Sequence, residues 1–82
     1  VDYKADWCGP CKTMLPILEN LAEEEEIVEI CKVDIESNTK VAIKSNVRAI
    51  PTLILFKGGI VVERFIGTKD KNSIKELFEK YL

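Results

Sequence analysis

Apolar residues recur at helical spacing in two segments of the chain. The first predicts an amphipathic helix from about Pro10 to Glu25, whose apolar face carries Leu15, Leu18, Leu21 and Ala22. The second places apolar residues at i, i+3, i+4 and i+7, namely Ile74, Leu77, Phe78 and Tyr81. Asp70 precedes them as a candidate N-cap, because its carboxylate can accept hydrogen bonds from the first free amides of a helix. The pattern therefore predicts a final helix that runs to Tyr81.

Four other segments have the alternation or the composition of β-strands. Val1 to Ala5 alternates apolar and polar residues, and residues 27–33 (Ile-Val-Glu-Ile-Cys-Lys-Val) are rich in β-branched side chains. Thr52–Phe56 and Ile60–Ile66 flank Lys57-Gly58-Gly59, a glycine turn that predicts a β-hairpin. A helix crossover joins the first two strands, so we expect them to pair in parallel.

A shorter helix is predicted between the second and third strands, from Asn38 to about Asn46. Its inward-facing residues are expected to be Val41, Ala42 and Ile43. The order of elements is then β-α-β-α-β-β-α, which predicts an α/β fold.

The composition fits one small globular domain over residues 1–82, because 46% of the residues are hydrophobic and 32% are charged. A formal net charge of −2 provides no basic surface for nucleic acid. No apolar run approaches the ~20 residues of a membrane span, so no membrane partner is expected. Three cysteines are too few for a secreted disulfide framework. We therefore expect a cytoplasmic protein.

Two of the cysteines, Cys8 and Cys11, are separated only by Gly9 and Pro10, a spacing that allows a disulfide to form and reopen. Cys8 falls at the start of the first predicted helix, where free amides and the helix dipole favour a thiolate. We therefore expect Cys8 to be the reactive sulfur and Cys11 its more sheltered partner. The alternatives are a structural disulfide and half of a zinc site. Zinc prefers four ligands, and the chain adds only Cys31 and no histidine.

The hexapeptide Trp7-Cys8-Gly9-Pro10-Cys11-Lys12 resembles the active-site signature of thioredoxins. Ile50-Pro51-Thr52 at the third strand, Pro16 in the first helix and Lys57-Gly58-Gly59 in the hairpin also lie where that family has them. The resemblance covers the whole chain. It implies a thioredoxin-like fold with a four-stranded mixed sheet flanked by helices, whose strands lie in the order second, first, third, fourth.

The resemblance also implies a thiol–disulfide oxidoreductase that carries electrons from a thioredoxin reductase to disulfide-containing target proteins, and so serves electron transport and cell redox homeostasis. Cys8 as thiolate would attack a target disulfide, and Cys11 would then displace the reduced target while the Cys8–Cys11 bond closes. No cofactor is expected beyond this redox-active disulfide. The alternative function is a non-catalytic binding or structural module excised from a larger protein.

Asp2 lies in a strand that is expected to be central, where burial of a lone carboxylate is costly and should raise its pKa. Lys32 lies in the neighbouring parallel strand. The two positions match the buried aspartate and its lysine partner in thioredoxins, which implies that Asp2 takes the proton of Cys11. In the alternative, Asp2 is simply solvated at a chain end.

The residues that the resemblance assigns to target binding are Trp7, Gly9, Pro10, Ile50, Pro51 and Gly67. A cis peptide bond between Ile50 and Pro51 would place the Ile50 backbone beside Cys8, where it can pair with an extended target strand. Trp7 and Gly67 would complete a flat apolar rim around it. The alternatives are a trans proline that opens a strand and a tryptophan that fills the core.

Compared with a complete thioredoxin, the chain is expected to lack an N-terminal strand and helix. The strand at residues 27–33 would then form an edge of the sheet, so we expect a monomer or weak self-association through that edge. Cys31 in this strand is expected to be an inert buried thiol, and a regulatory or dimer-forming thiol is the alternative.

Overall fold

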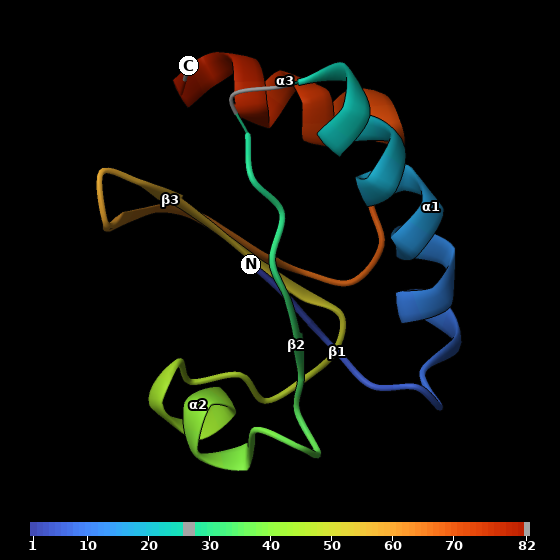
Figure 1. Cartoon of the computed structure of the whole chain (residues 1–82), viewed down its shortest axis with the longest axis vertical. Coiled ribbons are helices and arrows are strands. Elements are labelled where there is room, and N and C mark those ends of the chain that lie inside the picture. Colours follow the sequence, from blue (N-terminus) through green and yellow to red (C-terminus); the bar gives the residue numbers. More distant parts are fainter. Residues whose placement is uncertain (26–27, 82) are drawn as a thin grey trace.

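The seven elements of the chain follow the predicted order (Figure 1). The computed structural model describes residues 1–25 and 28–81. Its elements are β1 (Asp2–Lys4), α1 (Gly9–Glu24), β2 (Lys32–Asp34), α2 (Thr39–Lys44), β3 (Thr52–Lys57), β4 (Ile60–Ile66) and α3 (Lys71–Tyr81). The predicted β-α-β-α-β-β-α arrangement is confirmed. None of the described helices is long and apolar enough to cross a membrane.

The four strands form one mixed sheet in the order β2-β1-β3-β4, as predicted. β1 pairs in parallel with β2, which places Asp2 opposite Lys32. On its other side β1 runs antiparallel to β3, with Asp2 opposite Leu53. β1 therefore lies inside the sheet, while β2 and β4 form its two edges.

Helices cover both faces of the sheet, with α1 and α3 together on one side and α2 on the other (Figure 1). The largest buried cluster joins α1, β3 and α3 and comprises Met14, Leu18, Leu21, Leu53, Ile74 and Phe78. Burial of one such side chain contributes about 1.5–3 kcal/mol. The helical spacing of the apolar residues in α1 and α3 thus explains how both helices attach to the sheet.

Local signals set the hairpin and the last helix as predicted. Gly58 and Gly59 adopt φ values of 59° and 79°, a left-handed conformation that favours glycine, and they connect β3 to β4. Asp70 caps α3, because its Oδ1 accepts a hydrogen bond of 2.8 Å from the Ser73 amide.

Two expectations about the second strand are wrong. β2 comprises only Lys32–Asp34, whereas a strand over residues 27–33 was expected; Ile27 lies outside the described residues. A strand extends only as far as its partner, and β1 offers just three residues. Cys31 is exposed and not buried, because it precedes β2 at the open edge of the sheet.

The expectation for α2 is also partly wrong. The helix comprises Thr39–Lys44, and of its three apolar residues only Ala42 is buried while Val41 and Ile43 are exposed. A helix of six residues turns less than twice, so only a narrow face can contact the sheet.

Candidate active site

The turn from β1 into α1 presents Cys8 at the N-cap of the helix. Cys8 has an extended backbone, with φ of −83° and ψ of 111°, and the helix begins at Gly9. Pro10 lies in the first helical turn, where a missing amide hydrogen costs nothing because those amides have no partner within the helix. The sequence therefore starts the helix directly at the cysteine pair.

Cys8 and Cys11 are joined by a disulfide, with their Cα atoms 5.2 Å apart. The Cys11 amide donates a hydrogen bond of 3.1 Å to Cys8 Sγ. In the reduced form, the same amide and the helix dipole would stabilise a thiolate at Cys8. Both cysteines are 4% exposed in the disulfide form, so the expected greater shelter of Cys11 is not visible in the burial of the two residues.

Apolar residues from distant segments pack around the disulfide. Cys8 and Cys11 form a buried cluster with Ala5, and Ile35 and Ile50 pack against it. The peptide bond that follows Ile50 is cis, as expected. These contacts bring the end of β1, the loop after β2 and the loop before β3 to one place.

Gly67 follows β4 and joins the same region. Its amide donates a hydrogen bond of 2.8 Å to the Pro51 carbonyl, and its φ of 92° suits glycine. The structure thus brings Ile50, Pro51 and Gly67 together beside the disulfide, and Gly9 and Pro10 are exposed between the two cysteines.

Trp7 lies on the surface directly before Cys8, with 68% of the residue exposed. The alternative in which it fills the core is therefore wrong. Its Nε1 donates a hydrogen bond to Glu36 Oε1, from the loop between β2 and α2. This contact holds an exposed indole next to the cysteine pair.

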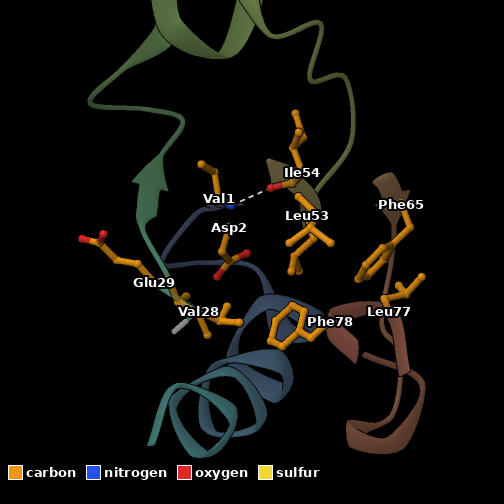
Figure 2. A pocket seen from close by; sticks show the side chains of 11 residues that line it. Val1, Asp2, Val28, Glu29, Leu53, Ile54, Phe65, Leu77 and Phe78 are labelled. Atoms are coloured by element: carbon orange, nitrogen blue, oxygen red, sulfur yellow. Dashed lines mark hydrogen bonds between the residues drawn. The ribbon is translucent and has the colours of Figure 1, made fainter. Parts of the chain in front are cut away.

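Asp2 is 1% exposed, so the alternative of a solvated carboxylate is wrong. Neither Oδ1 nor Oδ2 has a hydrogen-bond partner among the residues that the structure describes. Figure 2 shows the side chain among Val28, Leu53 and Phe78, which line a small cavity of about 30 Å³ with it. Burial raises the pKa of Asp2 above its ordinary value, and nearby positive charges oppose this only in part.

The expected contact between Lys32 and Asp2 is not present. Lys32 Nζ lies 3.1 Å from Glu19 Oε1 of α1, although the two backbones pair as predicted. Because β2 is an edge strand, the ammonium group can reach an exposed carboxylate and keep much of its hydration, whereas approach to buried Asp2 would desolvate it. Lys32 therefore acts on Asp2 only as a nearby positive charge.

Asp2 and Cys11 line the same cavity of about 390 Å³, together with Lys4, Ala5, Asp6, Lys12 and Leu15. The two residues therefore border one space. A water in such a space can connect two polar groups that do not touch.

Two residues of this region, Ile35 and Glu36, were not predicted from the sequence. They lie in a loop with no periodic pattern, and their contacts to the disulfide cluster and to Trp7 depend on the pairing of β1 with β2.

In the described part of the chain, no group of three or more His, Cys, Asp or Glu residues is arranged to hold a metal.

Comparison with known proteins agrees with this geometry. The family model described as Thioredoxin matches residues 1–80. A thioredoxin from Chlamydia trachomatis is 52% identical over 99% of this chain and 79% of its own length. A thioredoxin from Staphylococcus aureus is 43% identical over 100% of this chain and 80% of its own length. The fold matches a mutant thioredoxin of Halobacterium salinarum with a TM-score of 0.93 and 41% identity, over 98% of this chain and 70% of the other. The chain belongs to the thioredoxin family of thiol–disulfide oxidoreductases.

Proposed function

We propose that the protein reduces disulfide bonds of target proteins through Cys8 and Cys11 and is itself reduced by a thioredoxin reductase. The observation that carries the proposal is the disulfide at the start of α1, where a helix amide contacts Cys8 Sγ. Membership of the thioredoxin family supports dithiol–disulfide exchange as the chemistry.

In the reaction, the thiolate of Cys8 attacks one sulfur of the target disulfide. A mixed disulfide forms between Cys8 and the target, and the other target sulfur leaves as a thiolate that takes a proton from water. Cys11 then loses its proton and attacks Cys8 Sγ, which releases the second target sulfur and closes the Cys8–Cys11 bond. Two electrons pass to the target, and the reductase must return two electrons and two protons.

Asp2 is proposed to accept the proton of Cys11 in the second step. The shared cavity gives a route through water, and a carboxylate with a raised pKa binds that proton at a higher pH than an ordinary one. Lys32 is assigned the minor role of a nearby positive charge, because its ammonium group contacts Glu19.

The target is proposed to bind across Trp7, Gly9, Pro10, Ile50, Pro51 and Gly67. An extended target strand can pair with the free backbone groups at Ile50, as in other cases of strand addition. The proximity of Ile50 to the cysteine cluster and of Gly67 to Pro51 supports this assignment.

The remaining parts of the proposal concern the setting of the reaction. The chain is proposed to need no cofactor beyond its disulfide, to act in the cytoplasm, and to serve electron transport and redox homeostasis there. A reducing compartment suits the exposed free thiol of Cys31.

Reduction of insulin, followed by turbidity with dithiothreitol or a thioredoxin reductase as electron donor, tests the proposal. The wild type should accelerate precipitation of the insulin chains, and Cys8→Ser should not. Cys31→Ser is the matched control and should keep the wild-type rate. An unaltered rate in Cys8→Ser would refute the enzymatic function and favour a binding or structural module.

A further inference from the structure

We propose that Glu36 holds Trp7 on the target-facing surface and gives that surface a negative charge, which favours target disulfides flanked by Lys or Arg. The inference rests on the protein-disulfide reduction proposed above and concerns which targets that reaction prefers.

The first step is the contact between Trp7 and Glu36. An indole that is 68% exposed has few packing partners to fix its rotamer. The hydrogen bond from Trp7 Nε1 to Glu36 Oε1 supplies a fixed point from a residue 29 positions away in the sequence. Trp7 precedes the attacking cysteine, so its orientation shapes the surface that a target disulfide meets.

The second step is that Glu36 is itself held in place. Its amide donates a hydrogen bond of 2.9 Å to Asp34 Oδ1, which closes a tight turn after β2. The neighbouring Ile35 donates its amide to the Lys4 carbonyl at 3.0 Å, and its side chain packs against the cluster of Ala5, Cys8 and Cys11. The backbone that carries the Glu36 side chain is therefore anchored beside the disulfide.

The third step is that the charge of Glu36 is not neutralised. Lys4 pairs with the backbone of this loop, and its Nζ lies 3.1 Å from Asp6 Oδ1 and 4.0 Å from Asp34 Oδ2. In residues 1–25 and 28–81, no Lys or Arg nitrogen lies within 4.0 Å of the Glu36 carboxylate.

These steps predict a selectivity between targets. A cationic side chain next to a target cysteine can contact the Glu36 carboxylate beside Trp7, whereas an anionic side chain is repelled by it. Because the carboxylate is exposed, the preference should be about two- to fivefold at low ionic strength and should decrease with salt.

The experiment compares two synthetic peptides, each with one intramolecular disulfide, that differ only in Lys or Glu at the positions flanking the cysteines. The reduced protein is mixed with each peptide, and the second-order rate is followed at low and high ionic strength. Glu36→Gln keeps a hydrogen-bond acceptor for Trp7 but removes the charge, and Glu36→Ala removes both. Glu79→Gln, an exposed carboxylate of α3, is the matched control.

The wild type and Glu79→Gln should reduce the Lys peptide faster, and Glu36→Gln should reduce both peptides at nearly equal rates. Emission anisotropy of Trp7, the single tryptophan of the sequence, should be unchanged in Glu36→Gln and lower in Glu36→Ala. Equal rates in the wild type, a preference that persists in Glu36→Gln, or unchanged anisotropy in Glu36→Ala would overturn the inference. Failure of the wild type to reduce either peptide would instead refute the proposed function.

Discussion

Replacement of Asp2 by asparagine should stabilise the folded protein at neutral and alkaline pH. Both carboxylate oxygens are buried, and among the described residues they have no hydrogen-bond partner. Asparagine has nearly the same shape as aspartic acid and carries no charge at any pH. The variant therefore imitates the protonated form of Asp2, and any difference from the wild type measures the cost of ionising the carboxylate in the interior.

The raised pKa of Asp2 determines the sign of the effect. Between the ordinary value of 3.8 and the raised folded pKa, the folded protein keeps a proton that the unfolded chain has lost. Stability of the wild type then falls with rising pH by up to about 1.4 kcal/mol per unit, until the pH passes the folded pKa. A buried polar group without partners costs about 1–3 kcal/mol and a charged group costs more, but the amide of asparagine keeps the cost of the neutral group. We therefore expect Asp2→Asn to gain about 1–2 kcal/mol near pH 8, or roughly 5–15 °C in melting temperature.

The assay is urea unfolding of the disulfide form, followed by far-ultraviolet circular dichroism across a pH series from about 4 to 9. The gain of Asp2→Asn should be near zero at the acid end and should grow with pH. Asp6→Asn makes the same chemical change at a side chain that is 87% exposed and should show no such growth. A gain that is independent of pH, or a more stable wild type at alkaline pH, would refute the argument from burial.

Three further outcomes are expected. Leu18→Ala removes a fully buried side chain from the contact between α1 and the sheet and should lower the free energy of unfolding by about 2–5 kcal/mol in urea titrations. Asp70→Ala removes the cap of α3 and should lower the melting temperature. Because the hydrogen bond from the Ser73 amide lowers the pKa of Asp70, the difference in melting temperature between wild type and variant should disappear as the pH falls through that lowered pKa. Self-association through the exposed edge β2 should be weak, so light scattering should give a monomer at low concentration and a larger mean mass at high concentration, and a constant mass would exclude it.

The parts of the fold that the sequence predicted correctly depend on local physical signals. The spacing of Leu18 and Leu21 determines the buried face of α1, Gly58 and Gly59 determine the hairpin, and Asp70 determines the start of α3. The disulfide between Cys8 and Cys11 was also predictable, because the two cysteines are close in sequence and lie at a helix start. Each of these features needs only neighbouring residues to be recognised.

The parts that were missed depend on partners far away in the sequence. The β-branched run before Lys32 has the propensity of a longer strand, but β1 provides only three residues to pair with, and Cys31 is therefore exposed at the edge. Lys32 matched a partner of Asp2 by position, yet α1 supplies Glu19 at the same edge. Glu36 gave no signal at all, because its contact with Trp7 depends on the pairing of β2 with β1, which brings together residues 29 positions apart.

The central claim is that Cys8 attacks and Cys11 resolves, and trapping of the mixed disulfide tests it most directly. A Cys11→Ser variant with Cys31→Ser is reduced, mixed with a disulfide-bonded target such as oxidised insulin, and analysed by intact mass and peptide mapping. The protein should accumulate a stable one-to-one adduct at Cys8, and Cys8→Ser in the Cys31→Ser background should accumulate none. Absence of an adduct at Cys8, or an equal yield of adduct at Cys11 in the Cys8→Ser variant, would contradict the account.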